Sequence, residues 1–189
     1  MLKEELRKKY KALRKTISPS TAHDLSLAIA NKLLELPIWD KTNYHLFLAI
    51  ERFTEVNTDY IMHILHGKDK NIILSKSNFD SLEMAHFLLT DSTKIITNAY
   101  GIPEPTHGFE VNESSIDVVF VPLLAFDLKG NRVGYGKGFY DIFLQKCKPE
   151  TLKIGLSFFE PESEILQVTP QDIPLDYCVT PTTIFSFNG

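Results

Sequence analysis

Apolar residues recur at helical spacing along the first part of the chain. They are Leu2, Leu6, Tyr10, Leu13 and Ile17. This period predicts an amphipathic helix at the start of the chain. Ser18 followed by Pro19 has the form of an N-cap with proline at the first helical position, which predicts a second helix that stops before Pro37.

Short apolar runs alternate with further helical segments in the rest of the chain. Residues 44–50 are nearly all apolar, as expected of a strand buried on both faces. The other predicted strands are residues 71–75, 84–89, 118–121 and 153–157. Predicted helices begin after Thr58, ending near Gly67, and run from 139 to 147. Residues 161–181, rich in proline and acidic side chains, are expected to form an ordered loop. The alternation indicates an α/β fold with a mostly parallel central sheet covered on both faces.

Composition narrows the class of protein. The chain has 189 residues, 43% of them hydrophobic, which suits one globular domain over residues 1–189. A net charge of −4 argues against a general nucleic-acid binder. No apolar run approaches the length of a membrane span, and the charged start does not resemble a signal peptide. Cys147 and Cys178 have neither metal-site nor disulfide-framework spacing, so we expect reduced thiols and a cytoplasmic protein.

Three glycines stand at alternate positions between an apolar segment, residues 117–126, and the predicted helix at 139. They are Gly134, Gly136 and Gly138. Such a loop lets backbone N–H groups approach an anion, and the helix N-terminus adds positive potential. Lys137 and Arg132 are expected to act as mobile cations beside it. These features predict a phosphate site; the alternative is an ordinary tight turn between strand and helix.

The loop matches neither of two common phosphate motifs. A Walker A loop would have glycine at Asn131 and serine or threonine at Gly138. A dinucleotide fingerprint that starts at Gly134 would need glycine at Phe139. Asp141, in the first turn of the helix, adds a carboxylate where a metal ion could sit, or it only favours the helix N-terminus.

The first helix carries a second stripe, which is cationic. At about 100° per residue, Lys3, Arg7 and Arg14 fall within roughly 40° of one another beside the apolar face. The remaining basic residues of the helix are predicted to lie elsewhere: Lys8, Lys9, Lys11 and Lys15. The stripe is either solvated helix charge or a cationic edge over a ligand's phosphates.

Several polar or aromatic residues follow predicted strands. Ligands of open α/β sheets bind at the carboxyl ends of strands, which places Ile50 and Glu55 on the same edge as the glycine loop. Tyr100 stands in a rigid proline-containing turn and either walls a ring pocket or is only structural. Asp172 and Asp176 are either surface charge or, one of them together with Asp141, ligands of Mg²⁺.

In combination these motifs resemble the 5-formyltetrahydrofolate cyclo-ligase family, also called methenyltetrahydrofolate synthetase. The resemblance includes Lys-x-x-Leu-Arg at 3–7, Glu-Val-x-Thr at 55–58 and Gly-Ile-x-Glu-Pro at 101–105. Its most specific part is Gly-x-Arg-x-Gly-Tyr-Gly-x-Gly-Phe-Tyr-Asp at 130–141, and Asp-x-x-Val-Thr at 176–180 completes it. The motifs occur in the family's order over nearly the whole chain.

The resemblance implies a three-layer α/β/α sandwich and a ring-closing ligase that uses ATP and Mg²⁺ to convert 5-formyltetrahydrofolate into 5,10-methenyltetrahydrofolate. It implies catalytic roles for Lys137, Arg132 and Tyr140, metal ligation by Asp141 and Asp172, and folate contacts from Ile50, Glu55 and Tyr100. It further implies that the following residues contact ATP: Lys3, Arg7, Arg14, Arg132, Gly134, Tyr135, Gly136, Lys137, Gly138, Phe139 and Tyr140. We expect a monomer with small-molecule partners and no nucleic-acid or membrane partner.

Two other functions are compatible with the glycine loop. One is an enzyme of a related α/β fold that binds a sugar phosphate or a CoA ester, which leaves the cationic stripe unexplained. The other is a non-catalytic nucleotide-binding module, in which the basic helix would be a partner surface.

Overall fold

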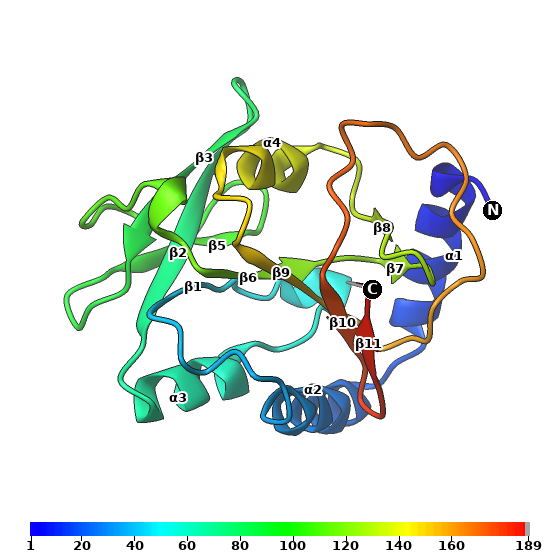
Figure 1. Ribbon diagram of the computed structural model, residues 1–189, viewed down its shortest axis with the longest axis horizontal. Coiled ribbons are helices and arrows are strands. Elements are labelled where there is room, and N and C mark those ends of the chain that lie inside the picture. Colours follow the sequence, from blue (N-terminus) through cyan, green and yellow to red (C-terminus); the bar gives the residue numbers. More distant parts are fainter. Residues whose placement is uncertain (188–189) are drawn as a thin grey trace.

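The computed structural model describes residues 1–187 and is built around one seven-stranded sheet (Figure 1). The strand order is β11-β10-β9-β6-β1-β2-β3. The bounds of these strands, in chain order, are β1 Asn43–His45, β2 Asn71–Asn78, β3 Glu83–Leu88, β6 Val118–Pro122, β9 Leu152–Leu156, β10 Tyr177–Val179 and β11 Ile184–Ser186. Strands β10, β9, β6, β1 and β2 pair in parallel, and β3 and β11 close the two edges in antiparallel orientation. The predicted mostly parallel sheet is confirmed.

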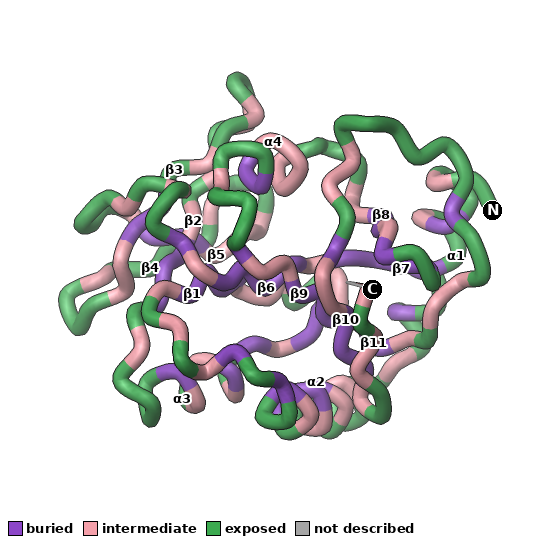
Figure 2. The backbone as a smooth tube through the Cα atoms, in the orientation of Figure 1, coloured by how far each residue is buried: buried purple, intermediate pink, exposed green. Residues whose placement is uncertain are grey.

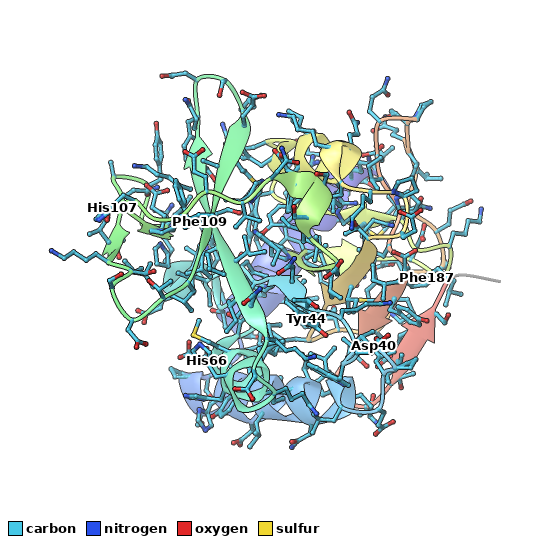
Figure 3. All side chains as sticks on the ribbon, turned by 60° about the vertical axis from the view of Figure 1, so that its left-hand side comes forward. Asp40, Tyr44, His66, His107, Phe109 and Phe187 are labelled. Atoms are coloured by element: carbon cyan, nitrogen blue, oxygen red, sulfur yellow. The ribbon has the colours of Figure 1, made fainter. Side chains whose placement is uncertain are left out.

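Helices cover both faces of the sheet. Helices α2 (Pro19–Leu33) and α3 (Asp59–Gly67) lie on one face and α4 (Phe139–Lys146) lies on the other, which confirms the three-layer α/β/α architecture (Figure 1). Tyr44 of β1, labelled in Figure 3, belongs to the core on the α2 and α3 side. Its ring stacks with Phe120, and its hydroxyl donates to the Ile38 carbonyl oxygen at 2.6 Å. The buried parts of the chain, purple in Figure 2, run through the middle of the sheet.

Each face of the sheet has its own hydrophobic core, and a third, smaller core lies between the first helix and a short ladder beside the sheet. Helix α1 (Lys3–Lys15) packs on the two-stranded ladder of β7 (Ala125–Phe126) and β8 (Arg132–Val133). Its apolar face contributes fully buried Leu6 and nearly buried Tyr10, as the helical period predicts. The Tyr10 hydroxyl donates to Glu162 at 2.7 Å, so α1 is also fixed to the segment before β10.

Two predicted helix caps have different outcomes. Ser18 is confirmed as an N-cap, because its hydroxyl accepts from the Thr21 N–H at 3.1 Å. Thr58 precedes α3, but its buried hydroxyl donates to the Phe47 carbonyl oxygen at 2.6 Å instead of capping the helix. That bond secures the chain after β1 to the start of α3.

Two predicted segments are wrong in their extent. Of the expected strand at 44–50, only Tyr44 and His45 belong to a ladder, because beyond Leu46 the chain turns away toward the 3₁₀ helix η1 (Glu51–Phe53). The strand predicted at 118–121 is confirmed as β6, and β7 follows it after a break at the end of the same apolar segment. The expected loop 161–181 contains β10, which fills the position next to β9. Apolar runs do not reveal which residues find a pairing partner.

The remaining elements are short. They are the hairpin of β4 (Ile95–Thr97) with β5 (Pro103–Pro105), and the 3₁₀ helix η2 (Glu113–Ser115). Cys147 and Cys178 are both free thiols. Within residues 1–187, none of the helices combines the length and the apolar character that crossing a bilayer demands. The single domain, the monomeric state and the cytoplasmic location stay predictions.

Candidate active site

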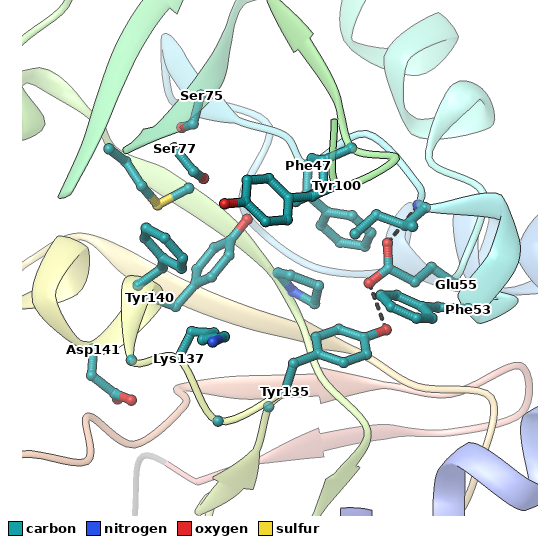
Figure 4. Close-up of a pocket in the computed structure, with 18 of the residues that line it drawn as sticks. Phe47, Phe53, Glu55, Ser75, Ser77, Tyr100, Tyr135, Lys137, Tyr140 and Asp141 are labelled. Atoms are coloured by element: carbon teal, nitrogen blue, oxygen red, sulfur yellow. Dashed lines mark hydrogen bonds between the residues drawn. The ribbon is translucent and has the colours of Figure 1, made fainter. Parts of the chain in front are cut away.

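A cavity of about 540 Å³ lies at the carboxyl edge of the sheet, between the glycine loop, α1 and the chain that follows β1 (Figure 4). Its size is in the usual range for small-molecule sites. The predicted site residues that line it are Lys3, Arg7, Ile50, Glu55, Tyr100, Arg132, Gly134, Tyr135, Gly136, Lys137, Gly138, Phe139, Tyr140, Asp141 and Asp172. Arg14 and Asp176 are not part of the lining. The predicted meeting of the glycine loop with Ile50 and Glu55 at one edge is therefore confirmed.

The glycine loop presents its backbone to this cavity. It runs from β8 to α4, which begins at Phe139 as predicted. Gly136 and Gly138 have φ angles of 97° and 81°, a region that side chains disfavour. No atom lies within 4 Å of the place where a Cβ on Gly138 would be. The open space and the free N–H groups of the first turn of α4 suit an anion.

Lys137 is the cation of this loop that has no ion-pair partner among residues 1–187. Its side chain is exposed at the cavity. The other predicted cations are engaged: the Lys3 ammonium lies 2.6 Å from Asp172, and the Arg7 guanidinium donates to the Gly134 carbonyl oxygen at 3.0 Å. Lys137 therefore can meet an incoming phosphate without first breaking an ion pair.

Arg132 was expected to be mobile, and that expectation is wrong. Its side chain is 6% exposed and lies 2.7 Å from the Asp141 carboxylate. It also donates to the Ile173 carbonyl oxygen. The same Asp141 oxygen, Oδ1, accepts from the Ile173 N–H at 3.1 Å, so one carboxylate oxygen joins β8, α4 and the chain before β10. The second oxygen, Oδ2, accepts no hydrogen bond from the described part of the chain.

The two aspartates proposed as alternatives for the metal occupy different places. Asp172 lines the cavity and accepts from Lys3 and from Thr169, whose N–H lies 2.7 Å away. Asp176 instead accepts from the Lys153 N–H at 2.7 Å and pairs with the Lys153 ammonium at 2.8 Å, and it lies outside the cavity lining. Position thus favours Asp172 over Asp176 as the partner of Asp141.

Within residues 1–187, no cluster of three or more histidine, cysteine or acidic side chains could hold a metal ion by itself. Mg²⁺ does not need one, because it binds through one or two carboxylates and shares substrate phosphate oxygens and water. Asp141 Oδ2 and the Asp172 carboxylate fit that requirement. The bonds from Lys3 and Thr169 all end on Asp172 Oδ2, so Asp172 can offer Oδ1 to the ion.

Acid should loosen α1 before it affects the rest of the fold. Desolvation opposes ionisation of Asp172, but the bonds from Lys3 and Thr169 outweigh it and lower the pKa of Asp172 below its ordinary 3.8. Bonds from Lys9 and then Tyr10 lower the pKa of Glu162 below its ordinary 4.5. Because both pKa values are lowered on folding, the stabilisation is present above these ordinary values and is lost as pH falls through the folded values.

We therefore expect amide exchange in α1, corrected for intrinsic rates, to rise relative to α2 below about pH 4. Asp172→Asn should lower the protection of α1 already at neutral pH and make its further loss in acid smaller, because one of the two titrating anchors is already gone. Equal loss of protection in α1 and α2 over the acid range would contradict the assignment of these carboxylates as anchors of α1.

A buried polar chain supports the opposite wall of the cavity. Arg14, only 3% exposed, donates to the Tyr135 hydroxyl at 2.8 Å. Tyr135 donates to Glu55 at 2.7 Å, and Glu55 accepts from the Ile50 N–H at 2.7 Å. Arg14 thus lies behind the wall, where it positions Tyr135, and not in the cavity. Burial raises the pKa of Glu55, although the bonds from Ile50 and Tyr135 and the charge of Arg14 oppose that shift.

Tyr135→Phe should destabilise the protein by about 1–3 kcal/mol, because it removes one hydrogen bond each from buried Glu55 and the buried Arg14 guanidinium. Denaturant unfolding at neutral pH would measure this difference. Tyr60→Phe is a suitable comparison, since it removes a hydroxyl that is bonded at the surface to His23. An equal effect of the two substitutions would show that the buried chain does not contribute as described.

Aromatic rings wall the space between these polar groups. The Tyr100 ring stacks on Phe79 with centroids 4.0 Å apart, and Phe53 stacks on Tyr135 at 5.0 Å. Burial raises the pKa of Tyr140, so its hydroxyl stays protonated and can donate. Figure 4 shows Tyr140 between the serines of β2 and Lys137. Flat rings and an uncharged donor suit an aromatic or heterocyclic ligand.

Several lining residues were not predicted. They are Lys11, His45, Phe47, Arg52, Phe53, Ser75, Ser77, Phe79 and Met84, among others. Lys11 had a signal: it stands four residues after Arg7 and therefore on nearly the same helix face, so placing it elsewhere was wrong. Phe79 and the two serines come from a strand and its turn, where no local pattern separates a cavity wall from a surface.

Comparison with known proteins supports one family. The family model described as "5-formyltetrahydrofolate cyclo-ligase family" matches residues 1–181. A relative from Schizosaccharomyces pombe, named "Probable 5-formyltetrahydrofolate cyclo-ligase", is 30% identical over 176 residues, which cover 84% of this chain and 85% of that protein. The mouse 5-formyltetrahydrofolate cyclo-ligase is 33% identical over 69% of this chain and 66% of its own. The solved structure of Aquifex aeolicus 5,10-methenyltetrahydrofolate synthetase superposes with a TM-score of 0.84 at 32% identity, covering all of this chain and 94% of that one.

Proposed function

The chain belongs to the 5-formyltetrahydrofolate cyclo-ligase family, a family of ligases, and from that premise we propose that it couples ATP to the closure of 5-formyltetrahydrofolate into 5,10-methenyltetrahydrofolate, releasing ADP and phosphate. One observation supports the ATP dependence most directly. The unpaired Lys137 and the open backbone of the glycine loop stand at one end of a cavity whose middle is walled by aromatic rings. A phosphate end beside a ring-binding space suits a nucleotide and a folate together.

ATP is needed because the formyl oxygen is amide-like and a poor leaving group. In the proposed reaction this oxygen attacks the γ-phosphorus of ATP, and the bond to ADP breaks. N10 then attacks the activated formyl carbon and loses its proton, and phosphate departs with the former formyl oxygen. Phosphoryl transfer needs positioning and charge neutralisation more than a protein nucleophile. Holding N10 near the activated carbon supplies a further part of the rate.

The chain's own residues supply these requirements. The N–H groups of residues 134–138 and the first turn of α4 would hold phosphate oxygens, and Lys137 would neutralise the charge that develops during transfer. Lys3 and Arg7 approach the same space from α1, and Arg7 lies directly against the glycine loop. Arg132, fixed by Asp141, would act as a positioned rather than a mobile cation. The Tyr140 hydroxyl would donate to the formyl or phosphate oxygen.

The folate would lie against Ile50, Glu55 and Tyr100. Glu55 is nearly buried, and its bonds to Ile50 and Tyr135 fix its orientation. A fixed carboxylate can accept an N–H of the folate ring, and Tyr100 with Phe79 offers an aromatic surface. Mg²⁺, held by Asp141 and Asp172, would neutralise charge on the phosphates of ATP.

The proposal is tested by mixing the purified protein with 5-formyltetrahydrofolate, ATP and Mg²⁺ and following the absorbance of the methenyl product. Product should appear only when all three are present and should stop when EDTA removes the metal. Product without ATP would contradict the coupling. ATP binding with no product would favour a nucleotide-binding module.

A further inference from the structure

Three polar side chains cross the sheet beneath α4 in a layer that is otherwise apolar. His45 of β1, Ser75 of β2 and His86 of β3 come from adjacent strands and lie on the same face. His45 Nε2 lies 2.6 Å from Ser75 Oγ, which lies 2.8 Å from His86 Nδ1. The two imidazoles are 0% and 3% exposed and pack against Phe143 of α4. Burying polar side chains costs free energy unless they form hydrogen bonds. It therefore matters which of the three side chains donates and which accepts.

The surroundings assign a direction to these bonds. Burial lowers the pKa of His45 well below its usual range and that of His86 to about 4, so both rings are neutral near pH 7. His86 Nε2 lies 3.7 Å from the Glu113 carboxylate, which favours the proton on that nitrogen and leaves Nδ1 as an acceptor. Ser75 then donates to His86 Nδ1 and accepts from His45 Nε2–H. This arrangement leaves a lone pair unpartnered at buried His45 Nδ1, and it directs the His86 Nε2–H toward Glu113 at a distance too long for a direct hydrogen bond.

Ser75 is left with one unused acceptor site. A serine hydroxyl has one proton and two lone pairs, and the histidines occupy the proton and one lone pair. Ser75 lines the cavity, as does Ser77, two residues further along the same face of β2. In Figure 4 both serines lie across the cavity from Lys137 and Asp141. The two serine hydroxyls therefore lie opposite the end of the cavity proposed for phosphate. The hydroxyl of Ser75 is held in one orientation by its bonds to the two histidines.

We propose that Ser75, oriented by His45 and His86, is a specificity-determining residue that accepts a hydrogen bond from an N–H group of the folate's fused heterocycle. This inference rests on the proposed function for the identity of the heterocycle. Ser77 adds a second, freely rotating hydroxyl beside it. The histidines are positioning residues, because they act through Ser75 and make no contribution to the phosphate end.

The test is equilibrium binding by calorimetry of 5-formyltetrahydrofolate and, separately, of ATP with Mg²⁺. Ser75→Ala should raise the dissociation constant for the folate by about tenfold and leave that for ATP unchanged, as expected for one lost hydrogen bond. Ser81→Ala is the matched control, since Ser81 stands on the same hairpin but outside the cavity lining. His86→Asn, whose amide oxygen can replace Nδ1 as acceptor, should retain more folate affinity than His86→Leu.

The possible results distinguish a failure of the inference about Ser75 from a failure of the proposed reaction. Unchanged folate binding in Ser75→Ala, or equal weakening of folate and ATP, would overturn the inference and assign Ser75 a purely structural role, which a lowered melting temperature would reveal. A wild-type protein that binds the folate without making product would contradict the proposed reaction. The ratio of the folate dissociation constants of Ser75→Ala and the wild type would still test the role of Ser75. A wild-type protein that binds ATP but no folate would overturn both.

Discussion

Lys137→Ala is expected to lower turnover by about 2–4 kcal/mol in activation free energy, a factor of roughly 30 to 900. The reason is that Lys137 is the cation of the glycine loop itself and has no ion-pair partner among residues 1–187, so its charge is available to a transferring phosphoryl group. Steady-state rates at saturating ATP would measure the effect. Stability should change little, because the side chain is exposed.

Lys94→Ala is the matched control for this substitution. Lys94 is an exposed lysine outside the cavity lining, so its loss changes net charge by the same amount without touching the site. Both variants should unfold at the same denaturant concentration as the wild type. A wild-type rate in Lys137→Ala would show that the glycine loop works without this cation and would remove Lys137 from the catalytic group.

Asp141→Ala is expected to cost both stability and turnover. It leaves the Arg132 guanidinium, 6% exposed, without its carboxylate, and removing one partner of a buried pair costs about 3 kcal/mol or more. It also removes Oδ2, the oxygen proposed for Mg²⁺. Denaturant unfolding and Mg²⁺-dependent turnover would measure the two losses separately.

Asp141→Asn separates those two roles. Both hydrogen bonds of Asp141 end on Oδ1, and the asparagine amide oxygen can accept them from Arg132 and the Ile173 N–H. We expect this variant to recover much of the stability that alanine loses, while turnover stays low and needs more Mg²⁺. If turnover recovered together with stability, Asp141 would be a structural partner of Arg132 and not a metal ligand.

The parts of the site that come from consecutive residues could be predicted from sequence. Alternating glycines between a strand and a helix predict a loop whose backbone is accessible, and α4 begins at Phe139 as the pattern predicts. The cap at Ser18 is equally local. The sequence pattern could not show which basic side chains form ion pairs or hydrogen bonds within the protein. Arg132 is buried because Asp141 and Ile173 happen to lie beside it, and Ile173 is 41 residues away in the chain.

Most of the predicted strands are present, but the strand β10 was missed for the same reason. Tyr177–Val179 has no distinctive period, and it becomes β10 only because β9 offers an open edge. Its angle around the helix axis places Arg14 in the cationic stripe. In the structure, however, Arg14 lies behind the cavity wall, where it donates to the hydroxyl of Tyr135, 121 residues further along the chain. Helical angle places a side chain on a face; packing decides whether that face meets a cavity or a neighbouring loop.

The ion pair between Lys3 and Asp172 has a consequence for the order in which the protein is made. Its partners are separated by 169 residues, and the Tyr10–Glu162 bond spans 152. At about 5–20 residues per second, a ribosome needs roughly 8 to 34 s to synthesise that interval. Throughout this time the N-terminal helix waits without its polar anchors. The end of the cavity that Lys3 lines is thus completed only after Asp172 has been synthesised.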